Sequence, residues 1–258
     1  MISVLHLGTI DYATGLRLQK HLVELRKDGR IGDVLLLLEH TSVITLGRNA
    51  KAKNILASPE SLAERGVEVF ESDRGGDVTF HGPGQLVGYP IFDLRGFPAH
   101  DGKRQTLGVI EYVRRLEEVL IRTCADFGIP SKRIAGLTGV WTEQNVEAKI
   151  AALGVHISRG VTSHGVALNV NTDLSFFNLI VPCGIETKPV TSMEKELGKK
   201  ILLGDVANSV SRNFGHVFES QILWLEKLED LTGPTVGVPL QTPSELRQLH
   251  EADDATWA

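Results

Sequence analysis

The chain has little cysteine and no long apolar run. Cys124 and Cys183 are the two cysteines among its 258 residues, too few for a disulfide framework or a zinc cluster, and free thiols fit a reducing compartment. No window approaches the roughly 18 apolar residues of a membrane helix. The N-terminus lacks the basic segment and apolar run of a signal peptide. We therefore expect a cytoplasmic protein with no membrane partner.

Missing motifs and missing charge argue against several other classes of protein. The formal net charge of −5 is not the basic excess of a nucleic-acid-binding protein. The sequence has no Gly-x-Ser-x-Gly motif of a serine hydrolase, and no pair of its nine histidines has the spacing of a zinc-binding helix. We expect no nucleic acid partner, no metal site and no cofactor.

Composition and periodicity predict one large globular domain. Hydrophobic residues make up 42% of the chain and charged residues 23%, which is ordinary for a protein with a packed core. The segment from residue 228 to 258 is expected to be peripheral, with a short helix near 244–250. Apolar patterning predicts strands at 2–7, 33–38, 43–46, 67–71, 78–80, 86–92, 139–142, 149–158 and 165–170, a helical turn at 61–65, and helices at 11–27, 106–127 and 205–218, the last capped by Asp205.

Lys149 and Cys183 are candidates for nucleophilic chemistry. Lys149 opens a strand-like run with a small-residue turn at 152–154, and Cys183 lies between a proline and a glycine, where the backbone can expose a small side chain. Strands joined by turns can bring the two residues together. A free cysteine has a pKa near about 8.5 and attacks as its thiolate, which a neighbouring ammonium favours and a neutral lysine can generate. Taken alone, the pattern also fits a buried apolar cysteine and a solvated lysine.

A glycine-rich segment, RGGDVTFHGPGQ, occupies residues 74–85. Glycine allows positive backbone dihedrals and close approach to a ligand, and such a loop can present amide donors to a carbonyl or phosphate oxygen. The segment is not a P-loop, because no Gly-Lys-Ser/Thr follows, and it is not the G-x-G-x-x-G fingerprint. A plain hairpin with a structural His81 is the alternative interpretation.

Two long stretches resemble one enzyme family. RGGDVTFHGPGQLVGYPI at 74–91 and KIAALGVHISRGVTSHGVALNVNTDLSFFNLIVPCGI at 149–185 are similar, in this order, to the octanoyl-[acyl carrier protein]:protein N-octanoyltransferases of lipoate biosynthesis. The similarity spans roughly residues 35–194. It implies an α/β (α+β) fold like that of biotin and lipoate protein ligases, with a mixed sheet flanked by helices, in a single catalytic domain over 1–258.

The resemblance also implies an activity and its residues. The family transfers an octanoyl group from octanoyl-acyl carrier protein to a lysine of lipoyl domains, in 2-oxoacid dehydrogenases and the glycine cleavage H protein. Cys183 matches the family's acyl-thioester nucleophile, and Lys149 matches the lysine that activates it. The implied substrate-binding positions fall in three segments: Arg74, Gly75, Gly76, Asp77, Val78, Thr79, Phe80 and His81; Ala152, Leu153 and Gly154; and Gly165, Val166 and Ala167.

Further contacts are expected with the acyl chain and with the carrier protein, and two other functions are compatible with parts of the sequence. Val78, Phe80 and Leu153 are expected to contact the eight-carbon chain, while an acidic carrier protein is expected to meet the basic residues Arg159, Lys188 and Lys195. An ATP-dependent lipoate or biotin ligase would share the fold but needs no nucleophilic cysteine. A non-catalytic module that binds an acyl group or a carrier protein would need neither Cys183 nor Lys149 for chemistry.

Overall fold

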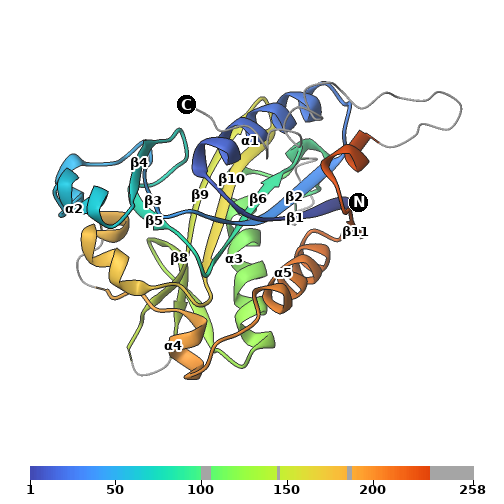
Figure 1. Cartoon of the computed structure of the whole chain (residues 1–258). Helices are drawn as coiled ribbons and strands as arrows, with labels where there is room; N and C mark the ends of the chain where they lie inside the picture. Colours follow the sequence, from blue (N-terminus) through green and yellow to red (C-terminus); the bar gives the residue numbers. More distant parts are fainter. Residues whose placement is uncertain (100–105, 144–145, 185–187, 233–258) are drawn as a thin grey trace, which may run out of the picture.

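The computed structural model describes residues 1–99, 106–143, 146–184 and 188–232. At its centre is an eight-stranded mixed sheet with the strand order β11-β1-β2-β6-β10-β9-β8-β7 (Figure 1). β1 is parallel to β2 and β11, and the other neighbouring pairs of this sheet are antiparallel. The strands are β1 (Ile2–Ile10), β2 (Asp33–His40), β6 (Gln85–Ile91), β7 (Ser131–Ile134), β8 (Leu137–Thr142), β9 (Lys149–Ser158), β10 (Val161–Asn169) and β11 (Ile222–Trp224).

Helices cover both faces of this sheet. α1 (Tyr12–Lys27) lies on one face, and α3 (Val109–Asp126) and α5 (Leu203–Val217) lie on the other (Figure 1). Apolar side chains of α1 pack with one face of the sheet into a core cluster, and those of α3 and α5 pack with the other face. β2 is apolar along residues 34–38 because these side chains are fully buried between the two layers. The predicted mixed sheet flanked by helices is therefore confirmed.

A second, three-stranded sheet lies beside the large one. Its order is β4-β3-β5, formed by β3 (Val43–Leu46), β4 (Glu68–Glu71) and β5 (Val78–His81), with α2 (Pro59–Glu64) next to it. The chain that follows β10 returns to this sheet, where Phe177 and Leu179 pack with Val78 and Phe80. This return places residues 182–184 close to β5.

The small residues at 152–154 do not form the predicted turn. They continue β9, where Ala152 pairs with Ala167 and Gly154 pairs with Gly165 of β10. Glycine at position 154 allows the loop at Gly75 to pack directly against β9, because a Cβ at Gly154 would lie 2.6 Å from the carbonyl oxygen of Gly75. Local composition alone does not distinguish this close approach from a turn.

Asp11 and Asp205 differ in the roles they take at helix starts. Asp11 precedes α1, and its Oδ1 accepts a hydrogen bond of 2.7 Å from the Thr14 N–H, which satisfies a free amide of the first turn. The predicted cap at Asp205 is wrong, because α5 begins at Leu203 and Asp205 lies inside its first turn. An acidic residue there still complements the helix dipole.

Several elements lie outside the sequence prediction. β7, β11 and the short α4 (Met193–Leu197) were not expected from the periodicity. Leu228 is buried in the core cluster that contains α1, so this residue does not belong to a peripheral tail. The helix expected near 244–250 lies outside the described residues. Within the described part of the chain, no helix is long and apolar enough to cross a membrane.

Candidate active site

Lys149 and Cys183 are in contact. The Nζ atom of Lys149 donates a hydrogen bond of 3.1 Å to the Sγ atom of Cys183. Lys149 begins β9, where its N–H donates to the Pro189 carbonyl and its carbonyl accepts from the Thr191 N–H. These backbone contacts fix the start of the strand, and the lysine is only 6% exposed. The spatial meeting expected from the sequence is therefore present.

Cys183 is presented by a turn with an unusual backbone. Its φ is +57° and that of Gly184 is +68°, a left-handed region that residues other than glycine rarely adopt. The turn is tied to the small-sheet region because the Val181 N–H donates 2.8 Å to the Asn54 carbonyl. Asn54 in turn donates 2.6 Å to the Asp77 carboxylate. Cys183 is partly buried, so its sulfur is held in a defined place without being sealed off.

Gly139 and Glu117 support the lysine from behind, and sequence reasoning missed both. A Cβ at Gly139 would lie 2.5 Å from the Cε atom of Lys149. The Gly139 N–H donates 3.1 Å to Glu117, whose side chain is fully buried. The ring of Trp141 lies 5.2 Å from Lys149 Nζ. In the sequence, Glu117 is a charged residue on the apolar face of the predicted helix. This unusual position could have indicated that Glu117 has a buried partner.

The Lys149–Cys183 pair opens into a cavity of about 470 Å³ between the two sheets, a size typical of small-molecule sites. All six implied positions of β9 and β10 line it. From the glycine-rich segment the lining includes Arg74, Gly76, Asp77, Thr79 and His81. Val78 and Phe80 lie instead in the core of the small sheet, because successive residues of a strand point to opposite faces. Neither residue is among those that line the cavity, and their contact with an acyl chain stays a prediction.

Arg74 organises the glycine-rich loop. Its guanidinium donates 2.7 Å to the carbonyl oxygens of both Thr45 and Asp77 and 3.0 Å to that of Gly75. The Gly75 N–H donates 3.0 Å to the Val155 carbonyl, which ties the loop to β9. Arg74 thus shapes one wall of the cavity through backbone contacts.

His81 lines the cavity as a neutral side chain. Burial lowers its pKa to about 3. Its Nδ1 lies 2.7 Å from Oε1 of Gln85, whose amide nitrogen donates to Phe80 and Asn169. Because Gln85 offers an oxygen, Nδ1 carries the hydrogen and Nε2 is left as an acceptor. His81 is therefore a structural histidine with an acceptor atom, not a base near neutral pH.

His40, Tyr12 and Tyr89 form an aromatic cluster that sequence reasoning missed. His40 Nε2 lies 2.7 Å from the Tyr89 hydroxyl, and its Nδ1 lies 3.0 Å from the Ile10 carbonyl. Burial lowers the pKa of His40 to about 4, so the ring is neutral at physiological pH. The rings of Tyr12 and His40 are 5.2 Å apart, and both tyrosines line the cavity. These residues come from three separate elements, and no local motif connects them.

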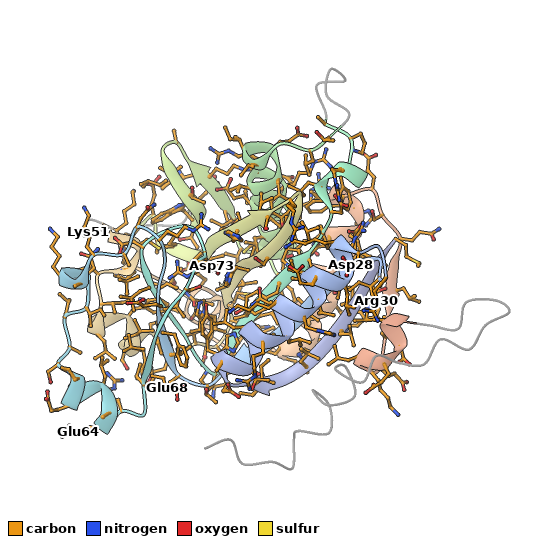
Figure 2. The ribbon with its side chains drawn as sticks, turned by 90° about the horizontal axis from the view of Figure 1, so that it is seen from above. Asp28, Arg30, Lys51, Glu64, Glu68 and Asp73 are labelled. Atoms are coloured by element: carbon orange, nitrogen blue, oxygen red, sulfur yellow. The ribbon has the colours of Figure 1, made fainter. Side chains whose placement is uncertain are left out.

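The expected basic residues lie in different places. Lys188 is beside the site, since its Nζ is 5.8 Å from the Trp141 ring and donates to Glu147. Arg159 follows β9, at the end of the strand opposite Lys149, where it lies 3.9 Å from Glu24. Lys195 lies in α4. Lys51 lines the cavity, and Figure 2 shows it at the periphery of the molecule.

Within the described residues, no group of three or more acidic, histidine or cysteine side chains could hold a metal ion.

Comparison with solved structures identifies the fold. A chain from the archaeal lipoylation system of Thermoplasma acidophilum, a bipartite lipoate protein ligase with its E2 lipoyl domain, aligns with a TM-score of 0.68 at 16% identity, covering 98% of this chain and 92% of that chain. Lipoate-protein ligase A bound with ATP aligns with a TM-score of 0.67 at 15% identity, covering 99% and 96%. The fold of lipoate protein ligases, expected from the resemblance, is confirmed.

Comparison with other sequences gives much closer relatives. A protein of Koribacter versatilis named octanoyltransferase is 63% identical over 253 residues, which cover 98% of each chain. A protein of Acidobacterium capsulatum with the same name is 61% identical over 236 residues, covering 90% of this chain and 96% of the relative. Residues 11–215 match the family described as the lipoyl protein ligase A/B catalytic domain. The chain therefore belongs to the lipoyl protein ligase A/B catalytic domain family.

Proposed function

We propose that this protein transfers an octanoyl group from octanoyl-acyl carrier protein to a lysine of lipoyl domains through a thioester on Cys183. The observation that carries the proposal is the 3.1 Å contact between Lys149 Nζ and Cys183 Sγ at a cavity suited to a small acyl group. Relatives named octanoyltransferase, 63% and 61% identical, support the acyl group and the reaction class. The acceptors are the lipoyl domains of 2-oxoacid dehydrogenases and the glycine cleavage H protein.

In the first half-reaction the Cys183 thiolate attacks the carbonyl carbon of the carrier-bound thioester. The bond from that carbon to the pantetheine sulfur breaks, and the Lys149 ammonium gives its proton to the departing sulfur. The products are octanoyl-Cys183, a free carrier thiol and a neutral Lys149. One lysine within hydrogen-bond reach of the sulfur can deliver this proton without help from solvent.

In the second half-reaction the neutral amine of a lipoyl-domain lysine attacks the Cys183 thioester. The carbon–sulfur bond breaks, an amide forms, and Lys149 accepts the proton that the attacking nitrogen loses. The Cys183 thiolate and the Lys149 ammonium are thereby restored. Exchange of one thioester for another is nearly isoenergetic and conversion of a thioester to an amide is downhill, so the cycle needs no ATP.

The cavity walls account for binding of the acyl chain. Ala152, Gly154, Gly165 and Ala167 leave room along β9 and β10, and Val87 adds an apolar surface. Each methylene buried from water contributes about 0.8 kcal/mol. These apolar contacts hold the chain while its carbonyl carbon reaches Cys183.

The test is intact mass measurement after mixing the protein with octanoyl-acyl carrier protein in the absence of ATP. We expect one octanoyl group on Cys183, labile to hydroxylamine, in the parent and in Cys124→Ser. Cys124 is fully buried, and burial raises the pKa of its thiol to about 12, so it does not compete. Cys183→Ser should carry no thioester and should not transfer. An adduct that requires ATP would favour a ligase that forms an acyl adenylate, and full transfer by Cys183→Ser would refute the covalent mechanism.

A further inference from the structure

The acyl cavity runs along β10 from the reacting pair to His164. Cys183 and Lys149 share a small cavity with Ala152, Ala167 and Asn169, which places the reacting pair beside residues 167–169 of β10. His164 lies three to five residues earlier on this strand, about 10 to 17 Å away at a rise of about 3.3 Å per residue. An extended eight-carbon chain measures about 9 Å between its end carbons, given bonds of about 1.5 Å at tetrahedral angles.

His164 separates this cavity from a second one. The second cavity, of about 380 Å³, lies between α1 and the β9–β10 hairpin, with Leu16 and Val23 among its walls. Among the described residues, His164 is the one that lines both cavities. The space on the far side of the imidazole is therefore large enough for a longer chain, and the histidine side chain closes the way into it.

Two hydrogen bonds hold His164 in this position. Its ring Nε2 lies 2.7 Å from the Asp73 carboxylate, and its backbone N–H donates 2.7 Å to the side-chain amide oxygen of Gln19. Its φ is +55°, an unfavourable value for histidine that persists because the surroundings fix it. The side chain is almost fully buried. Asp73, labelled in Figure 2, is itself exposed to solvent.

We propose that His164 is the end wall of the acyl site and sets the maximum length of the acyl group that reaches Cys183. The inference rests on the proposed acyl transfer and adds the residue that determines its chain-length specificity. A chain longer than eight carbons must bend inside the cavity or push the imidazole away from Asp73. Removal of the imidazole joins the two cavities and relieves that conflict.

The experiment measures loading of Cys183 from hexanoyl to dodecanoyl carrier proteins by intact mass in single turnover. His164→Gly suits the positive φ, and His164→Asn is a second small residue that tolerates this backbone. In both variants we expect the ratio of decanoyl to octanoyl loading rates to rise at least about tenfold, the lower end of what a pocket discriminates per methylene. Lys20→Ala, in the outer wall of the second cavity, should keep the parent ratio.

A double variant tests where the longer chain goes. Ser163 lines the second cavity, so His164→Gly combined with Ser163→Leu should fill the opened space and return the decanoyl-to-octanoyl ratio toward that of the parent. A parent-like ratio in both folded single variants, verified by thermal unfolding, would overturn the proposal. A high ratio in the double variant would also overturn the assignment of the second cavity.

The experiments distinguish an error in the role of His164 from an error in the proposed acyl transfer. If the parent loads no octanoyl group at all, the transfer mechanism fails first. Calorimetric binding of free octanoate and decanoate to Cys183→Ser, with and without His164→Gly, then tests the wall without any chemistry. Only the protein with His164→Gly should bind decanoate at least as tightly as octanoate. If the ratio of decanoate to octanoate affinity is the same in the two proteins, His164 is not the end wall of the acyl site.

Discussion

Gly139 and Lys149 lie on neighbouring strands so close together that no side chain fits between them. A Cβ at Gly139 would lie 2.5 Å from Cε and 3.3 Å from Nζ of Lys149, and β8 meets β9 here at an irregular register. The absence of a side chain at 139 is thus what lets the lysine fold back toward Cys183. The position of the ammonium is set by a residue that has no functional group of its own.

The first prediction follows from this contact. Gly139→Ala should lower single-turnover octanoyl transfer by about tenfold to a hundredfold, because displacement of a catalytic group by about 1 Å has an effect of that size. Rapid-quench measurement of transfer provides the test. The matched control is Gly128→Ala, since Gly128 also has a positive φ, of +76°, but open space around its Cβ position. Equal losses of transfer in the two variants would assign the effect to backbone strain alone.

The second prediction separates two roles of Lys149. Lys149→Arg keeps a positive charge beside Cys183, so alkylation by iodoacetamide at neutral pH should remain fast, whereas a guanidinium cannot release its proton in this pH range. Transfer by this variant should therefore be poor. Lys149→Ala should be slow in both assays. Near-parent transfer by the arginine variant would leave electrostatic activation as the only role of the lysine.

The third prediction concerns the carrier protein. Lys51 and Lys188 lie at the cavity and beside the Lys149–Cys183 pair, whereas Arg159 follows the opposite end of β9. Charge reversal of Lys51 and Lys188 should weaken the apparent affinity for octanoyl-acyl carrier protein, and the parent affinity should fall as salt rises through about 0.15 M. Arg159→Glu is the control. An affinity that depends on Arg159, or not on salt, would contradict this docking face.

The fourth prediction links stability to two buried histidines. The pKa of His81 is lowered to about 3 and that of His40 to about 4, both below about 6.5 in the unfolded chain. Below about pH 6.5 the unfolded state binds more protons, so this stability is fully present above that pH and is lost as pH falls toward 4 and 3. Each histidine should add a slope of up to about 1.4 kcal/mol per pH unit.

Denaturant unfolding between pH 4.5 and 7.5 measures these slopes. His81→Gln should flatten the decline of unfolding free energy with falling pH, because one proton-linked difference is removed. His6→Gln changes an exposed histidine and should leave the slope as it is. A His81→Gln slope equal to that of the parent would show that the ring is not held neutral by burial.

The sequence permitted prediction of elements whose signal is local. β3 has the predicted bounds, and the apolar run of β2 indicated a strand buried on both faces. Lys149 and Cys183 stood out because a cysteine between proline and glycine is a conspicuous feature, and the family resemblance assigned them a role. Their contact depends on the return of the chain from β10 to the small sheet, which local patterns suggested only in outline.

Features that depend on long-range contact were not predictable from local patterns. Gly139 resembles any other strand glycine until β8 is paired with β9. His40 and Tyr89 meet at 2.7 Å although 49 residues separate them. The error at 152–154 has the same origin, since glycine at 154 is required by the loop at 75. The secondary structure depends largely on local sequence patterns, whereas the geometry of this site depends on strand register and on close approach between backbone segments.

A chase of isolated octanoyl-Cys183 protein tests whether the thioester is a true intermediate of the transfer. The thioester form is prepared with octanoyl-acyl carrier protein, freed of donor and mixed with a lipoyl domain in the absence of ATP. We expect the octanoyl group to leave Cys183 and appear as an amide on the domain lysine, at a rate no slower than overall turnover. A thioester that persists beside an unmodified domain, or transfer that begins only when ATP is added, would contradict it.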